Sequence, residues 1–432
     1  MRSSKSRLAA SVAAIFAALA LPVLALALAG CGLLPGNTRE GETIPPASAG
    51  PATDLGLGPG VRLLSFGPGD KGSPRVNPSG ERVAFVLDGD VAEKPLYAQS
   101  FQRRTASEFG AEHTEWLTDE GLATLSPQNE TADRGTRTMP NPSSLFGIRP
   151  DGSSSDGPSD IARIVEDVTA AGAVPGGGAV AAVAIPSESS EELAWSRLAL
   201  LQGSEEPVRT YLRSIKGSVT GLSISPDGRG AVMAVRRDTS GTESRFEVQT
   251  YQFSEGSVSR VARLPRGMEI LGAPQWTQGG IHFVAGEADG QVAGDRSPAL
   301  YTLYRLLPGS GEPEPVRGVG EDFVAASIRV SPDGDRLAVV GRRNPGSPTN
   351  LYVLDLASGT LEAATANDNM EVKTNPLDLA WFPDGRYVIL VARGVLSGPK
   401  AYDAPAQSLA SPFYNLYRVP VTDLPVERES EG

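Results

Sequence analysis

The sequence contains very little cysteine and histidine, the residue types that dominate disulfide frameworks and zinc sites. One cysteine and two histidines occur among its 432 residues. A single cysteine cannot form a disulfide within the chain, so burial and hydrogen bonds must hold the fold. A metal site at His113 would need ligands from elsewhere in the chain. We therefore expect no metal and no cofactor.

Several catalytic and nucleotide-binding motifs are also missing. No Gly-x-Ser-x-Gly motif occurs, which argues against the nucleophile elbow of α/β-hydrolases. The glycine run at 176–178 lacks the following Lys-Ser/Thr of a phosphate-binding loop. The turns Asp-Gly-Asp at 88–90 and Asn-Asp-Asn at 367–369 carry oxygen ligands but do not match a calcium loop. His282 alternates with apolar neighbours and is expected as a half-exposed strand residue. We expect no catalytic constellation and no enzyme activity.

Helical periodicity and positive charge are scarce as well. Beyond the N-terminal apolar run, only 159–169 is a weak helix candidate. The 49 glycines and 35 prolines are spread throughout, which is typical of many tight turns between short strands. This composition predicts an all-β protein.

Acidic residues outnumber basic ones, 51 to 39, which argues against nucleic-acid binding and against a polybasic membrane surface.

The N-terminus has the pattern of a targeting segment. Three basic residues within positions 2–7 precede an apolar run at 8–28. A run of this length could also cross a bilayer as an uncleaved anchor. However, Leu-Ala-Gly-Cys at 28–31 resembles a bacterial lipobox, which implies that Cys31 carries a lipid and becomes the mature N-terminus. Residues 1–31 are thus expected to be a lipoprotein signal peptide, and their removal takes the net charge from −12 to −15.

The expected mature protein lies in the cell envelope, outside the cytoplasm, and is attached to a membrane by its lipid. Residues 32–60 are dominated by Gly, Pro, Ala and Thr and contain no aromatic residue, which predicts a disordered tether. Residues 61–422 form the folded body, and 423–432 form a polar tail. Because the surface carries no basic excess, the lipid provides the membrane attachment.

The body consists of one repeated unit, seen most clearly at 328–359. A strand leads into a Ser-Pro-Asp-Gly turn at 331–334, which is followed by an apolar strand and a Leu-Tyr strand. Turns of this kind begin at residues 77, 126, 174, 225, 277, 331 and 382. Candidates for the fourth strand include 115–118 and 161–165. Four strands per repeat of about 50 residues is typical of a β-propeller blade.

The sequence thus predicts a single β-propeller of four-stranded blades. Seven turns favour seven blades. Six blades result if the polar run at 128–137 in the second repeat is a loop instead of a strand. The strand at 61–66 precedes the first turn and has no blade of its own, while the last repeat ends without a fourth strand. We expect the N-terminal strand to complete the last blade and close the ring.

The Ser-Pro-Asp-Gly turns, the apolar strand after each and the Asn-Leu-Tyr strand resemble the WD40-like PD40 repeats of TolB-type propellers. A lipobox followed by a propeller resembles the propeller half of the actinobacterial LpqB-type lipoproteins. The resemblance spans residues 61–422 and implies the propeller fold. The chain lacks the N-terminal domains of both families, so their partner interactions do not carry over.

An arginine pattern provides the candidate binding residues. Arg236, Arg342 and Arg393 lie eleven residues beyond the start of their turns, and Arg237 and Arg343 follow two of them. Equivalent repeat positions occupy equivalent places in a propeller, so these side chains are expected on one rim, opposite the turns. Arginine forks bind carboxylate or phosphate bidentately. The alternative is that these loops are simply polar.

Two functions remain as hypotheses. The first is a monomeric, TolB-like interaction module that binds an envelope protein, peptide or glycan at its rim or channel mouth. The second is a hydrolase or lyase that uses carboxylates in the central channel. The expected first strands contain few carboxylates, which favours the interaction module.

Overall fold

The computed structural model contains only β-strands as regular elements in the part of the chain that it describes. It describes residues 57–58, 60–65, 68–98, 100–105, 109–127, 143–148, 161–175, 178–185, 195–202, 208–237, 245–287, 301–320, 322–367, 370–394 and 413–422. None of these residues forms a helix that could span a membrane. The signal peptide with Cys31, most of the tether, the polar run at 128–137 and the tail lie outside the described residues.

The described strands pair in six antiparallel sheets. One sheet contains β2 (Lys71–Val76), β3 (Arg82–Leu87), β4 (Asp90–Pro95) and β5 (Gln102–Arg103). A seven-stranded sheet contains β6 (His113–Trp116), β7 (Leu122–Ser126), β8 (Ser143–Ile148), β9 (Ile161–Ala173), β10 (Ala179–Ile185), β11 (Trp195–Gln202) and β12 (Val208–Lys216). The third contains β13 (Ser218–Ile224), β14 (Gly230–Arg237), β15 (Arg245–Gln252) and β16 (Ser257–Arg263).

The other three sheets follow in chain order. The fourth contains β17 (Met268–Thr277), β18 (Gly280–Glu287), β19 (Tyr301–Leu306) and β20 (Glu314–Pro315). The fifth contains β21 (Val324–Val330), β22 (Arg336–Arg342), β23 (Asn350–Asp355) and β24 (Leu361–Ala363). The sixth contains β25 (Met370–Val372), β26 (Leu379–Trp381), β27 (Tyr387–Gly394), β28 (Asn415–Pro420) and the N-terminal β1 (Arg62–Leu63).

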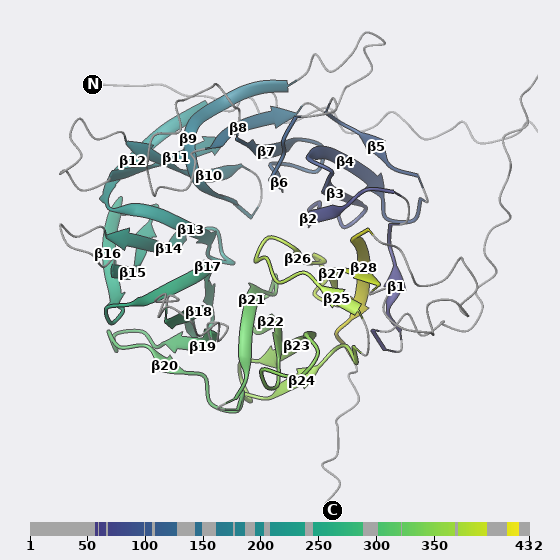
Figure 1. The fold of residues 1–432 in the computed structure, drawn as a ribbon. Helices are drawn as coiled ribbons and strands as arrows, with labels where there is room; N and C mark the ends of the chain where they lie inside the picture. Colours follow the sequence, from purple (N-terminus) through teal and green to yellow (C-terminus); the bar gives the residue numbers. More distant parts are fainter. Residues whose placement is uncertain are drawn as a thin grey trace, which may run out of the picture. The chain divides into compact units, whose positions relative to one another are not determined.

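The sheets of residues 57–422 are arranged around a common centre (Figure 1). The strands nearest the centre, β2, β6, β9, β13, β17, β21 and β26, contact one another in this order, and β26 contacts β2. Hydrophobic clusters fill the space between neighbouring sheets. In one of them, Val340 and Leu351 of the fifth sheet pack with Leu390 of the sixth. Each such buried side chain contributes about 1.5–3 kcal/mol to stability.

The seven-stranded sheet depends on one long strand. β9 pairs with β8 from Ile161 to Val168 and with β10 from Val168 to Ala173. The prediction of a strand at 161–165 is confirmed, and the weak helix candidate at 159–169 is wrong. β-branched residues at 161, 164, 165, 168 and 169 explain why this segment forms a strand.

The apolar second strands were predicted correctly, but the second repeat was misread. Ser126 belongs to β7 and does not begin a turn. The turn lies at 117–121, where Leu117 N–H donates to Gly121 O (2.8 Å) and Gly121 N–H donates to Thr118 Oγ1 (2.8 Å). It contains no proline, which is why the pattern missed it. Residues 115–118 are therefore not an outer strand of the first sheet, because β6 is an edge strand of the next sheet, at the end nearest the centre of the ring.

His282 is another correction. This histidine was expected to be half exposed, yet its exposed fraction is 1%. Thr277 Oγ1 lies 3.1 Å from His282 Nδ1 and donates its own proton to Gly280 O (2.9 Å). Nδ1 therefore carries the proton of the neutral ring and donates to Thr277. Burial, with the nearby Arg305 charge, lowers the pKa of His282 to about 4.

The two ends of the described chain meet in one sheet. β1 pairs antiparallel with β28 through Arg62 opposite Arg418 and Leu63 opposite Tyr417. Leu64 N–H donates to Leu416 O at 2.8 Å. The N-terminal strand expected at 61–66 is thus present, at 62–63, beside the last strand of the chain.

Candidate functional site

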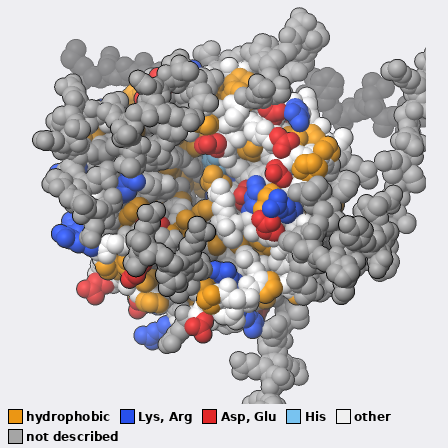
Figure 2. All heavy atoms as spheres, viewed as in Figure 1, with side chains coloured by type: hydrophobic (Ala, Val, Ile, Leu, Met, Phe, Trp, Pro, Cys, Tyr) orange, Lys and Arg blue, Asp and Glu red, His pale blue; other side chains and the backbone are white. Residues whose placement is uncertain are grey.

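A cavity of about 670 Å³ lies where the innermost strands meet. In the space-filling view, apolar side chains and a group of Lys/Arg and Asp/Glu side chains border the central part of this face (Figure 2). The cavity extends to the turns, where Pro226 and Pro332 belong to its lining. Its size is in the range of small-molecule sites in proteins.

Equivalent positions of the innermost strands line this cavity. Each of these strands runs into the turn that leads to the second strand of its repeat. The residue two positions before the start of each turn lines the cavity, and these residues are Arg75, Glu115, Gly172, Ser223, Gln275, Arg329 and Ala380. Two arginines and one glutamate thus lie at equivalent positions of three different sheets.

Arg75 is completely engaged with the protein. Its Nε donates to Glu115 Oε1 (2.9 Å), and its Nη1 donates to the carbonyls of Pro74 (2.6 Å) and Leu377 (3.0 Å). The indole of Trp116 donates to the backbone carbonyl of Arg75 at 2.9 Å. The exposed fractions of the Arg75 and Glu115 side chains are 5% and 7%. Arg75 is therefore a fixed part of the cavity wall.

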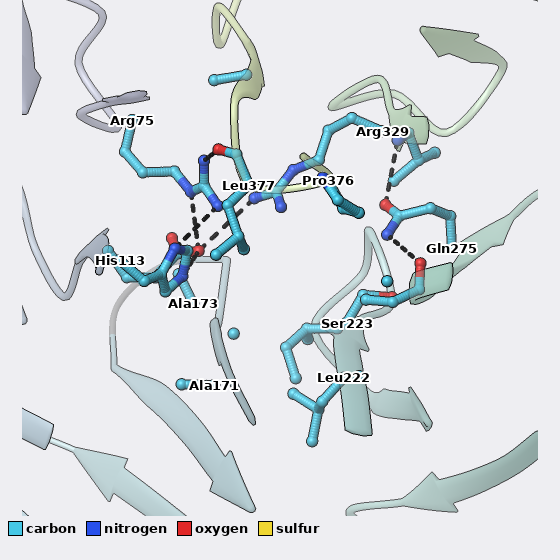
Figure 3. A pocket seen from close by; sticks show the side chains of 18 of the residues that line it. Arg75, His113, Ala171, Ala173, Leu222, Ser223, Gln275, Arg329, Pro376 and Leu377 are labelled. Carbon is cyan, nitrogen blue, oxygen red and sulfur yellow. Dashed lines mark hydrogen bonds and ion pairs between the residues drawn. The ribbon is translucent and has the colours of Figure 1, made fainter. Parts of the chain in front are cut away.

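Arg329 approaches the same carboxylate from another sheet. Its Nη2 lies 3.8 Å from Glu115 Oε1, and its side chain is 30% exposed. The indole of Trp381 donates to the backbone carbonyl of Arg329 at 2.8 Å, as Trp116 does for Arg75. Figure 3 shows the Arg75 and Arg329 side chains converging on the side of the cavity where His113 lies.

His113 completes the cluster. Its Nδ1 lies 2.9 Å from Ser73 Oγ and 3.4 Å from Arg75 Nη2. Because a guanidinium can only donate, Nδ1 is the acceptor, and the neutral ring carries its proton on Nε2. Nε2 lies 2.9 Å from Glu115 Oε1, but its N–H direction is too poorly aligned for a good hydrogen bond.

The charges of this cluster do not cancel. Burial raises the pKa of the Glu115 carboxyl, but the Arg75 charge and the contact with His113 outweigh it and hold that pKa well below its usual range. Burial and the Arg75 charge lower the pKa of His113. Burial also lowers the pKa of Arg329, to about 10. At neutral pH the cluster therefore contains two cations, one anion and a neutral imidazole.

This arrangement suits an anion better than a metal ion. Among the described residues, no group of three or more His, Cys, Asp or Glu side chains could hold a metal. Glu115 Oε1 already faces a guanidinium at 2.9 Å, which would repel a cation. Glu115 is also a poor general acid, because it is ionised at neutral pH.

The structure places four of the five predicted rim arginines in the last residues of second strands, and only Arg343 in the loop that was expected to carry them. Arg236 and Arg237 end β14, Arg342 ends β22, Arg343 follows it, and Arg393 is next to last in β27. None belongs to the described lining of the central cavity.

Arg237 and Arg393 are held in ion pairs. Arg237 Nε contacts Glu247 Oε2 at 3.0 Å. Arg393 Nη2 contacts Glu371 Oε2 at 2.7 Å, and its guanidinium lies 4.6 Å from the ring centroid of Tyr414. Arg343 is exposed, and Arg236 and Arg342 are half-buried.

The central cluster was not predicted from the sequence. Arg75 and Arg329 were placed in first strands but were not recognised as partners. Glu115 was assigned to an outer strand and His113 was considered only as a metal ligand, because the second repeat was misread. The signal that could have found them is the Thr-Asp-Glu-Gly turn at 118–121, which puts Glu115 at the same position as Arg75 and Arg329.

Comparison with known proteins identifies the fold alone. No protein-family model matches the chain, and no curated protein matches it. The chain is similar to an oligogalacturonate lyase from Vibrio parahaemolyticus, with a TM-score of 0.51 and 12% identity over 84% of this chain and 94% of that chain. It is also similar to the β-propeller domain of the Trilobed protease from Pyrococcus furiosus, with a TM-score of 0.49 and 11% identity over 81% and 95%.

A third solved structure is a putative TolB from Agrobacterium tumefaciens, with a TM-score of 0.40 and 12% identity over 83% of this chain and 93% of that chain. The neighbours thus include β-propellers of TolB-like and other types. The antiparallel sheets around a common centre themselves give the described part of this chain the all-β architecture of a β-propeller.

Proposed function

We propose that this protein is a non-enzymatic interaction module of the bacterial cell envelope, attached to a membrane through a lipid on Cys31. Its central cavity is the binding site for a protein, peptide or glycan partner. The observation that carries this proposal is the cavity of about 670 Å³ with its buried, charge-unbalanced cluster. A buried charged cluster of this kind lowers the stability of the fold. Ligand binding is a function that would explain why the protein retains it.

We also propose that the ring has seven four-stranded blades. The seven-stranded sheet then counts as two blades that share β9, and β1 completes the last blade. The pairing of β1 with β28 and the seven equivalent cavity-lining positions support this arrangement. Replacing Leu63 with Pro should expose the backbone amides of β28 to hydrogen exchange. Unchanged protection of β28 would contradict closure by β1.

A lyase or hydrolase is the second candidate. One observation favours it: His113 Nε2 and Glu115 Oε1 lie 2.9 Å apart beside the cavity. Oligogalacturonate is a reasonable test substrate, because one fold neighbour is named as an oligogalacturonate lyase. Against it, Glu115 is the one carboxylate in the described lining, and its low pKa makes it a weak base. Formation of unsaturated product from oligogalacturonate, followed by ultraviolet absorbance, would favour the enzyme.

The main proposal is tested by partner capture with a matched pair of variants. Ala173 lines the cavity, and Ala173→Phe should partly fill it. Ala357 is exposed in a turn, so Ala357→Phe adds the same ring outside the cavity. Full-length proteins are used as bait in solubilised envelope. Capture should be lost with Ala173→Phe and kept with Ala357→Phe, and equal capture by both would contradict the proposal.

A further inference from the structure

We propose that the central cavity binds a ligand that carries a carboxylate or phosphate group on an apolar body, and that Arg329 is the residue that holds this group. The inference rests on the proposed function, because it takes the cavity to be the binding site. It goes further by naming the chemistry of the ligand and the residue that recognises it.

The first argument is the excess charge. Arg75 and Arg329 both approach Oε1 of Glu115, at 2.9 Å and 3.8 Å. Glu115 is the one carboxylate in the described lining of the cavity, and His113 is neutral at pH 7 because its pKa is lowered. One positive charge therefore remains without compensation. A charge in a poorly solvated site is stabilised by an opposite charge, which an anionic ligand would supply.

The second argument is the different engagement of the two arginines. Arg75 donates to Glu115 and to two backbone carbonyls, and its side chain is 5% exposed. Arg329 is 30% exposed, and its distance of 3.8 Å from Glu115 is longer than a hydrogen bond. The Arg329 guanidinium is therefore available for a planar, bidentate contact with a ligand anion. Trp381 fixes its backbone by donating to the carbonyl of Arg329.

The third argument concerns the rest of the wall. Two other polar side chains at equivalent positions are occupied by the protein. The Ser223 hydroxyl donates to the carbonyl of Pro274. Gln275 donates to the carbonyl of Ala273 (3.0 Å) and accepts from the N–H of Val330 (3.2 Å).

Most of the remaining lining residues are apolar, with Asn375 and Thr220 among the polar exceptions. The apolar lining includes Ala171, Ala173, Leu222, Pro376 and Leu377. Figure 3 shows Pro376 and Leu377 beside the Arg329 side chain and Ala171 and Leu222 farther away along the cavity. The ligand therefore meets one cationic fork and an apolar wall. A carboxylate or phosphate on an apolar body fits this surface, whereas a uniformly hydroxylated ligand would leave its polar groups without partners.

The inference is tested by calorimetry on the full-length protein in a non-ionic detergent. The probes are cyclohexanecarboxylate with its uncharged amide, phenyl phosphate, and a short peptide ending in Leu with either a free or an amidated C-terminus. Binding of the acid should be at least about tenfold tighter than binding of the amide of the same shape. The two acid–amide pairs distinguish a free small carboxylate from the C-terminus of a peptide, and phenyl phosphate tests the phosphate.

Variants identify the residue. Arg329→Gln should bind acid and amide alike, and Arg329→Lys should retain part of the preference because it keeps the charge without the fork. Arg229→Gln is the control, since that side chain is 84% exposed in a turn and does not line the cavity. Removing an uncompensated cation should not lower the unfolding temperature of the ligand-free protein, so loss of binding by Arg329→Gln reports recognition and not misfolding.

The outcomes separate this inference from the proposed function. If acid and amide bind equally well, or if Arg329→Gln keeps the preference for the acid, Arg329 does not recognise an anion, although the cavity still binds ligands. If no probe binds while Ala173→Phe abolishes partner capture, the anion inference is overturned and the proposed function stands. If no probe binds and Ala173→Phe captures partners normally, both are overturned.

Discussion

Arg329 and Glu115 face each other across the centre of the ring, with Nη2 and Oε1 3.8 Å apart, although they belong to sheets that are not neighbours. β21 contacts β17 and β26, whereas β6 contacts β2 and β9. The pair therefore spans the channel. The distance between the two side chains depends on every sheet between them, so a change in the packing of the ring should change this distance.

Replacing Glu115 with Gln should destabilise the protein. The change leaves the buried Arg75 guanidinium without its carboxylate, and losing one partner of a buried ion pair costs about 3–5 kcal/mol. Urea unfolding at pH 7 measures the change in the free energy of unfolding. Glu255→Gln, at an exposed position in a turn, is the control and should change it by less than about 0.5 kcal/mol. Equal stability of both variants would mean that the Arg75–Glu115 pair is solvated.

The same pair should make stability depend on pH in the acid range. The pKa of Glu115 is lowered in the folded protein, so its contribution is present above the unfolded pKa of about 4.3 and is lost as the pH falls below it. The Glu115→Gln variant lacks this contribution at every pH. The difference in unfolding free energy between the two proteins should therefore shrink on acidification, and a difference that grows would contradict the assignment.

Protonation of His282 should also weaken the protein on acidification, and at a higher pH than protonation of Glu115 does. Its pKa is about 4 in the folded state and about 6.5 in an unfolded chain, so the unfolded state takes up a proton first. Stability is complete above about pH 6.5 and falls as the pH drops towards 4, by roughly 3 kcal/mol. In His282→Asn, the amide can replace Nδ1–H, and denaturation between pH 7 and 4 should show a flatter dependence. Parallel curves for the two proteins would argue against a buried neutral His282.

Gly221 should tolerate no side chain. A Cβ at this position would lie 2.3 Å from the carbonyl oxygen of Gly272 and 2.8 Å from Ala273 Cα, so β13 and β17 would have to separate beside the cavity. Overpacking of this kind typically costs about 1–3 kcal/mol. Thermal unfolding of Gly221→Ala measures the effect. Gly279→Ala is the control, because the nearest atom to its Cβ is 3.9 Å away, and a similar loss in both variants would contradict the close approach.

The predicted rim can be tested by reversing the charge of two neighbouring arginines. Arg342→Glu with Arg343→Glu should weaken partner capture and leave thermal unfolding unchanged, if the rim predicted from the repeat register binds an anionic partner. Arg237 and Arg393 are unsuitable because reversal would disturb Glu247 and Glu371. Arg229→Glu provides an exposed control near the opposite, turn-bearing end. Equal capture by the rim variant and the control would exclude the rim.

The sequence predicted the repeated strands well because each has its own local signal. The Ser-Pro-Asp-Gly turn before β22 and the β-branched residues within it allow no other simple interpretation. The central site was harder to predict, because its members are far apart in the chain. One proline-free turn at 117–121 shifted the second repeat, and that shift placed Glu115 on the outside. Even with the right register, only the ring itself brings Glu115 and Arg329 together.

The long strand β9 has a mechanical consequence. Its backbone pairs with β8 on one part of its length and with β10 on the other, with register shifts between residues 163 and 170, so the strands before and after it belong to one hydrogen-bonded sheet. Elsewhere, adjacent sheets of the described part are joined mainly by side-chain packing and by single backbone hydrogen bonds such as Lys71 N–H to Tyr414 O, which slide more easily than a hydrogen-bonded ladder. Motion of neighbouring sheets relative to one another should therefore be larger at the interfaces around Arg329 than within the seven-stranded sheet that carries Glu115.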